Sequence, residues 1–115
     1  MQTAKKMPAS ARQDEYARLC ALLASPGWIS EGSAQDRGAR GRSPCYAWTR
    51  KVKGKTVCVA LSKEQYEWLK LAIANWRNVQ KTLRQMQRLS REELFEAIPG
   101  PKRRKKLSQR VLGLA

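Results

Sequence analysis

Positively charged side chains are the residues of this sequence whose type and spacing point most directly to chemistry. The chain has 24 Lys or Arg against nine Asp or Glu, no His, and a formal net charge of +15 over 115 residues. Such an excess repels itself in a folded chain, and binding to a polyanion offsets that cost. The charge therefore predicts a polyanionic partner, with nucleic acid as the first candidate and an anionic membrane surface as the second.

The segment from residue 37 to 55 contains seven cations and no acid, and we call it the basic segment. Its first three arginines lie among glycines and small residues, which suit close approach to a phosphate backbone, although a solvated linker has the same composition. We predict phosphate contacts from Arg37, Arg40, Arg42, Arg50, Lys51, Lys53 and Lys55.

A second group of cations follows one face of a predicted long helix, and we call it the basic stripe. At 100° per residue its six members fall within a sector of about 80°, and no acid interrupts them. An ordinary exposed helix alternates acids with bases to gain i,i+4 pairs, so we interpret the stripe as following a phosphate backbone, with a merely solvated face as the alternative. The stripe consists of Lys70, Arg77, Lys81, Arg84, Arg88 and Arg91.

A third group of five consecutive cations lies near the C-terminal end of the sequence, just after two prolines. We predict a disordered basic tail over 99–115, which would bind any polyanion without reading its sequence. The five cations are Lys102, Arg103, Arg104, Lys105 and Lys106.

Catalytic and metal-binding patterns are missing from the sequence. Without His there is no imidazole base and no catalytic triad that depends on one. The three cysteines, Cys20, Cys45 and Cys58, form no CxxC pair. We therefore expect no enzyme activity, no metal and no cofactor.

Aromatic residues beside the cations are candidates for stacking on bases. Trp28 and Tyr46 flank the glycine-rich segment and are the better candidates. Trp48, Trp68 and Trp76 are expected in the core, where large aromatic side chains are more often found.

The elements that would position these residues can be read from local patterns. Ser10 begins a helix over 11–24, and residues 1–9 form an arm before it. Residues 31–43 have no apolar period and are expected to be a loop. A hairpin over 46–61 follows, with its turn at 53–56, so that residue 52 pairs with 57 and residue 48 with 61.

The hairpin should place one apolar face, with Trp48, Val57 and Val59, on the start of a long helix. Ser62 begins that helix and Ser90 restarts a short one over 91–97, each as the first residue of a capping box. The predicted fold class is therefore α+β: an N-terminal helix, a two-stranded β-hairpin, a long amphipathic helix, a short helix and the basic tail. We expect residues 10–98 to form one domain.

The long helix also carries an apolar seam with the 3-4-3-4-3 spacing of a heptad pattern. A partner helix must cover it. The helix over 11–24 can cover only part, so either that helix folds back as an antiparallel neighbour or a second copy of the chain covers the rest. The seam consists of Leu69, Ala72, Trp76, Val79, Leu83 and Met86.

Two resemblances add to these expectations. The residues Gly32-Ser33, Pro44 to Arg50, Val52, Gly54-Lys55-Thr56 and Lys63-Glu64 resemble a family of small uncharacterised prokaryotic proteins. Its members are often encoded near transposases or other mobile elements. The hairpin followed by a helix is also similar to the arm-binding domains of phage integrases and to plant AP2 domains. That similarity implies base contacts by Arg50, Lys51, Lys53 and Lys55.

The sequence therefore predicts a small accessory protein that binds DNA or RNA mainly through phosphates and does not act as an enzyme. A mobile-element enzyme or another nucleoprotein machine is a candidate partner. The alternative is a protein-interaction or dimerisation module that acts through the seam. No apolar stretch reaches the roughly 18 residues that span a bilayer and no signal peptide is evident, so we expect a cytoplasmic protein that does not bind membranes.

Overall fold

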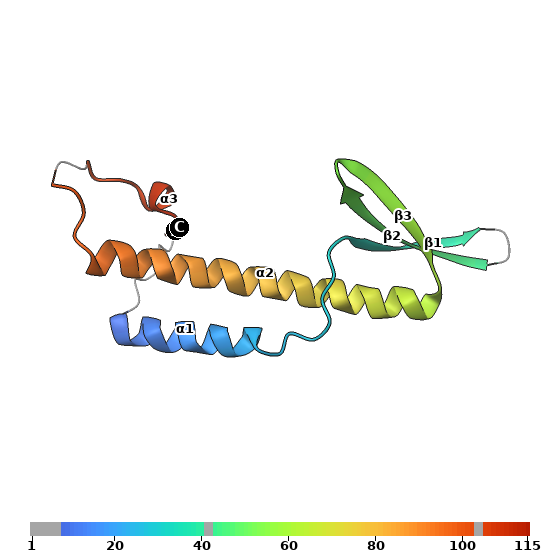
Figure 1. The fold of residues 1–115 in the computed structure, drawn as a ribbon, viewed down its shortest axis with the longest axis horizontal. Coiled ribbons are helices and arrows are strands. Elements are labelled where there is room, and N and C mark those ends of the chain that lie inside the picture. Colours follow the sequence, from blue (N-terminus) through green and yellow to red (C-terminus); the bar gives the residue numbers. More distant parts are fainter. Residues whose placement is uncertain (1–7, 41–42, 103–104) are drawn as a thin grey trace. The chain divides into compact units, whose positions relative to one another are not determined.

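The fold is α+β, as the sequence predicts, and the computed structural model describes residues 8–40, 43–102 and 105–115 (Figure 1). The elements in chain order are α1 (Ala9–Leu23), β1 (Ser33–Arg40), β2 (Ser43–Val52), β3 (Lys55–Leu61), α2 (Lys63–Ala97) and α3 (Gln109–Leu112). The chain forms two compact units. We call residues 26–80 the sheet unit and residues 1–25 with 81–115 the helical unit, so that α2 contributes to both.

The sheet has three antiparallel strands in the order β1-β2-β3, so the prediction of a two-stranded hairpin is incomplete. Strand β1 occupies most of the segment that the sequence predicts to be a loop. Its pairing register with β2 shifts between Asp36 and Ala39, and the Gly38 N–H donates to the Asp36 carboxylate over 2.9 Å. This bulge interrupts the alternation of side chains, and the backbone pairing itself needs no apolar residues, which explains why the strand has no visible period.

The predicted hairpin between β2 and β3 is confirmed, but its register is wrong by two residues. Lys53 and Gly54 both have positive φ, 51° and 81°, which is the signature of a two-residue type I′ turn. Val52 therefore pairs with Lys55, and Trp48 pairs with Val59. Because a shift of two residues preserves the alternation of side chains, every residue stays on its predicted face.

The link into β1 fits closely against the central strand at Gly32. The Trp48 indole N–H donates to the carbonyl of Glu31 over 3.0 Å. Gly32 has a φ of 100°, and a Cβ on it would collide with the Trp48 indole nitrogen and lie 2.7 Å from the Thr49 carbonyl oxygen.

Replacing Gly32 with Ala is therefore expected to destabilise the protein by about 2–3 kcal/mol, from backbone strain together with overpacking. Urea denaturation followed by Trp fluorescence measures this loss. Gly54→Ala is the matched control, because Gly54 also has a positive φ but nothing within 4 Å of its Cβ position. Equal losses in the two variants would contradict the close fit at Gly32.

Contacts between the sheet and α2 differ from the predicted ones. Val57 and Val59, which were expected to pack on the helix, are 36% and 41% exposed. The Tyr46 ring instead stacks on the ring of Tyr66 in α2, with centroids 4.8 Å apart. A register that places Tyr46 opposite Leu61 brings its ring to the first turns of α2, where Tyr66 lies.

Helix boundaries follow the capping prediction at one of three places. At Ser62 the box forms: the Gln65 N–H donates to the Ser62 hydroxyl over 3.1 Å, and the Gln65 amide oxygen accepts from the Ser62 N–H. At Ser10 the prediction is wrong, because α1 begins after Pro8 without a side-chain cap. The predicted break at Ser90 is also wrong, since its hydroxyl donates to the Met86 carbonyl inside a continuous α2.

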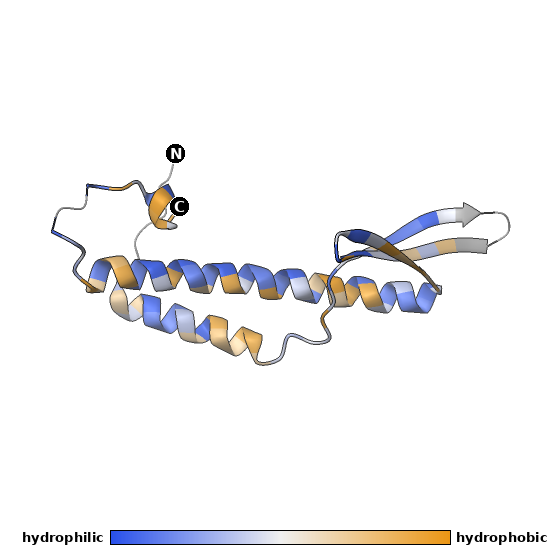
Figure 2. Ribbon diagram, turned by 45° about the horizontal axis from the view of Figure 1, so that its top comes forward, coloured by the Kyte–Doolittle hydropathy of each residue, from blue (hydrophilic) through white to orange (hydrophobic). Residues whose placement is uncertain are grey.

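The helical unit has a small core beside an amphipathic stretch of α2, whose alternating colours are visible in Figure 2. Leu19 of α1 is 1% exposed, and Leu89 of α2 is also buried. Arg12 of α1 is buried as well and forms ion pairs with Glu93 and Glu96, each at 3.1 Å. The Arg12 Nε contact with Glu93 lacks hydrogen-bond geometry and is purely electrostatic.

The C-terminal segment is not wholly a disordered tail, and that prediction is corrected. Ser108 caps α3 by accepting from the Val111 N–H, and Gly113 ends the helix with a φ of 74°. Leu114 is buried. The Arg88 guanidinium of α2 donates to the Leu114 carbonyl over 2.9 Å, so a cation of the basic stripe holds this segment in place.

Candidate nucleic-acid interface

The tip of the β2–β3 hairpin gathers three exposed lysines of the basic segment. Lys53 lies in the turn, Lys51 lies in β2 opposite Thr56, and Lys55 begins β3 opposite Val52. Because residue pairs alternate between the faces of a hairpin, Lys51 and Lys55 point to opposite faces. The tip therefore presents positive charge on both faces and at its end. We call Lys51, Lys53 and Lys55 the hairpin lysines.

The arginines of the basic segment are placed differently. Arg37 in β1 is exposed and donates to the Gln35 side-chain oxygen over 3.2 and 3.3 Å. Arg50 is half-buried, and its guanidinium lies 4.8 Å from the centre of the Trp48 ring, a cation–π contact. Arg40 ends β1, and Arg42 lies outside the described residues. Arg50 thus has a contact partner, Trp48, within the sheet unit.

Ion pairs distinguish the two units. Within the described residues every ion pair belongs to the helical unit, where Arg12, Arg18 and Arg88 find acidic partners. The sequence of the sheet unit contains ten Lys or Arg and four Asp or Glu, and no described cation of that unit lies in an ion pair. The hairpin lysines are therefore exposed and uncompensated.

The residues of the basic stripe differ in whether they bond to other groups of the protein. Lys70, Arg77, Lys81 and Arg84 are exposed, and the Lys70 ammonium lies 5.8 Å from the centre of the Tyr66 ring. Arg91 donates to the Gly113 carbonyl and to the Gln87 side chain, both over 3.4 Å. Arg88 bonds to the C-terminal segment and also pairs with Glu92 at 3.6 Å. Two of the six predicted stripe cations thus have hydrogen-bond or ion-pair partners within the protein, and Lys70 has a ring contact.

Acidic and basic side chains of the helical unit also affect each other's titration. The hydrogen bond from Arg18 lowers the pKa of Glu15, and the same bond raises the pKa of Arg18. Both groups lie at the surface of α1. Arg18 therefore has a carboxylate partner, in contrast to the hairpin lysines.

The predicted tail cations are only partly placed. Lys102, Lys105 and Lys106 are exposed, whereas Arg103 and Arg104 lie outside the described residues. Residues 1–7 of the predicted N-terminal arm also lie outside them.

Two of the aromatic residues, Tyr46 and Trp68, are placed differently from the predictions. Tyr46, a stacking candidate, is already stacked on Tyr66. Trp28 is 75% exposed and lies 6.3 Å from Trp68, ring centre to ring centre. Trp68, expected in the core, is 54% exposed, so that prediction is wrong. Trp28 remains the one stacking candidate from the sequence that is accessible among the described residues.

Comparison with known proteins adds no relative: no protein family, no curated protein and no solved structure matches the chain. In the described ranges no cluster of Cys, Asp and Glu is arranged to hold a metal ion. No helix among the described residues is long and apolar enough to cross a membrane.

Proposed function

We propose that the protein binds nucleic acid through its phosphates, with the tip of the β2–β3 hairpin as the principal contact, and that it performs no catalysis of its own. One observation carries this proposal. The hairpin lysines are exposed and uncompensated, while every ion pair in the described part of the chain lies in the helical unit. A polyanion supplies the neutralising charge that the sheet unit lacks.

The shape of the sheet unit supports the same proposal. The major groove of B-DNA, about 12 Å wide, admits a two-stranded β-ribbon. Lysines on both faces and at the turn of such a ribbon can contact phosphates on both sides of a groove. The sheet unit also places a three-stranded antiparallel sheet directly before α2.

The stripe residues without an ion pair or a hydrogen bond in the described part of the chain are further candidates for phosphate contact. Lys70, Arg77, Lys81 and Arg84 are exposed cations along α2. We infer that they add phosphate contacts, and that the exposed tail lysines add charge without specificity. We also infer an accessory role beside a DNA-processing enzyme, which would supply the chemistry.

A binding titration tests the proposal. The titration uses labelled duplexes of equal length and base composition, one reference sequence and several scrambled versions of it. They should bind with affinities within about threefold of each other, because phosphate contacts carry no sequence information. A single-stranded RNA of the same length in the series separates DNA from RNA binding. A protein that binds none of these ligands contradicts phosphate binding, and a protein that prefers one duplex sequence by orders of magnitude contradicts binding mainly through phosphates.

A further inference from the structure

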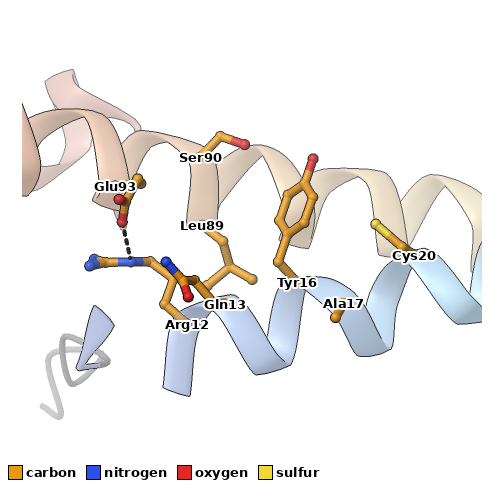
Figure 3. Close-up of a pocket in the computed structure, with 8 residues that line it drawn as sticks. All are labelled: Arg12, Gln13, Tyr16, Ala17, Cys20, Leu89, Ser90 and Glu93. Carbon is orange, nitrogen blue, oxygen red and sulfur yellow. Dashed lines mark ion pairs between the residues drawn. The ribbon is translucent and has the colours of Figure 1, made fainter. Parts of the chain in front are cut away.

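A groove of about 700 Å³ runs between α1 and the C-terminal part of α2 within the helical unit (Figure 3). Gln13, Tyr16, Ala17 and Cys20 of α1 line one wall, and Leu89 and Ser90 of α2 line the other. Figure 3 shows the Tyr16 ring and the Cys20 thiol directed toward α2 along this groove. The groove is a largely apolar surface that nothing in the chain covers among the described residues.

Charge sets this groove apart from the remainder of the chain. Among the described residues that line it, only Arg12 and Glu93 are charged, and these two form an ion pair with each other. In a chain with a net charge of +15, a face without unpaired charge offers nothing to a phosphate backbone. It is, however, a face across which two highly charged copies can approach without facing each other's cations.

The seam of α2 continues the apolar surface beyond the groove. At 100° per residue, Leu83, Met86, Ser90 and Glu93 lie within about 80° of each other on α2. Leu83 is 38% exposed. The sequence predicts that the N-terminal helix covers only part of the seam, and α1 buries Leu19 and Arg12 beside α2 and leaves Leu83 open.

The small core of the helical unit argues for an additional layer. Its described residues bury three large apolar side chains, Leu19, Leu89 and Leu114. Helical units of this size are marginally stable alone, and oligomerisation is a common remedy. Two antiparallel helices with an open groove between them are half of a four-helix bundle.

We propose that the groove is occupied by the same groove of a second copy of this chain. The two copies would pair across a two-fold axis as a bundle of two α1 helices and two α2 segments. In such an isologous contact, a residue that touches a second residue across the axis is touched by it in return, so large side chains such as Tyr16 and Met86 of one copy can fill the space beside Ala17 and Ser90 of the other. This inference does not rest on the proposed nucleic-acid function.

Light scattering coupled to size exclusion tests the proposal with the full chain. Nuclease treatment and about 1 M salt, where the Debye length is about 3 Å, remove any association bridged by nucleic acid. The wild-type protein is expected at twice the chain mass of 13.1 kDa. A wild-type protein that stays at the mass of one chain overturns the proposal, whichever other protein it binds.

Two matched variants locate the interface. Cys20→Arg places a charge in the groove and should yield the monomer. Leu22→Arg adds the same charge to the same helix, about 160° away at 100° per residue, and should remain dimeric; Leu22 is 52% exposed and does not line the groove. If circular dichroism shows that Cys20→Arg is unfolded, Ser90→Arg on the opposite wall decides by the same criterion. A folded groove variant that remains a dimer contradicts the proposed interface.

Discussion

The double variant Lys53→Asn, Lys55→Gln is expected to bind duplex DNA about 60-fold more weakly than the wild type at about 0.1 M salt. Each phosphate contact contributes about 0.9 to the slope of log affinity against log salt, which corresponds to about eightfold in affinity at this salt concentration. Both side chains are exposed, and neither has an acidic partner among the described residues. Their removal therefore deletes two contacts without freeing a partner inside the protein.

The choice of Asn at position 53 keeps the hairpin intact. Lys53 has a φ of 51°, a conformation that Asn tolerates well, and Asn-Gly is the preferred pair in a type I′ turn. Circular dichroism and thermal melting should therefore match the wild type. Any loss of binding is then caused by the loss of the two positive charges and not by unfolding.

The control variant Arg18→Gln, Arg91→Gln removes the same amount of charge elsewhere. Arg18 pairs with Glu15, and Arg91 donates to Gly113 and Gln87, so both have partners within the protein. Its affinity should fall by less than about threefold, since long-range attraction alone is weakened and screened by salt. Equal losses in the two double variants would mean that only net charge matters and that the hairpin has no special part.

The second large effect concerns stability and the buried Arg12. Replacing both Glu93 and Glu96 with Gln should destabilise the protein by about 3 kcal/mol, because it leaves a buried guanidinium without a compensating charge. Arg12 is 3% exposed, whereas the two glutamates are 48% and 39% exposed. Arg12→Met should cost less than about 1 kcal/mol, because the released carboxylates return to water and Met fills the buried space.

Urea denaturation at a fixed protein concentration measures both variants. Glu64→Gln, Glu67→Gln is the matched control, since these two exposed glutamates lie on the same helix and in no ion pair within the described residues. It should change the free energy of unfolding by less than about 0.5 kcal/mol. If Arg12→Met lowers the free energy of unfolding more than the replacement of both glutamates does, the account of the buried Arg12 is wrong.

Strong local signals made much of the fold predictable. The capping box of Ser62 with Gln65 and an uninterrupted helical pattern predicted the start and most of the length of α2. Alternation of side chains predicted the faces of the hairpin even though its register was two residues off. These features depend on residues only a few positions apart.

Features that depend on distant parts of the chain were not predictable. Strand β1 exists because β2 supplies hydrogen-bond partners, and its bulge at Gly38 hides the period. The C-terminal segment is held by carbonyl contacts with Arg88 and Arg91, which the sequence shows only as members of a charged stripe. Gly113, just after a short apolar run and three residues beyond a basic residue, was the one available sign of a helix end there.

The candidate site was predicted at the level of segments and not of single cations. An acid-free run from 37 to 55 did indicate the hairpin tip, and three of its lysines are exposed there. Which cations have partners depends on side-chain placement in the folded chain: Arg50 lies over Trp48 of the same strand, and Arg88 reaches Leu114 in the C-terminal segment. Sequence alone cannot distinguish such engaged cations from accessible ones.

The salt dependence of wild-type binding to a duplex tests the central claim most directly. If the hairpin lysines, the exposed stripe residues and the tail contact phosphates, log affinity should fall linearly with log salt, with a slope of about −5 to −9 for six to ten contacts. The variant Lys53→Asn, Lys55→Gln should lower the magnitude of that slope by about 1.8. A complex whose affinity does not change between about 50 and 200 mM salt would contradict phosphate binding as the basis of function.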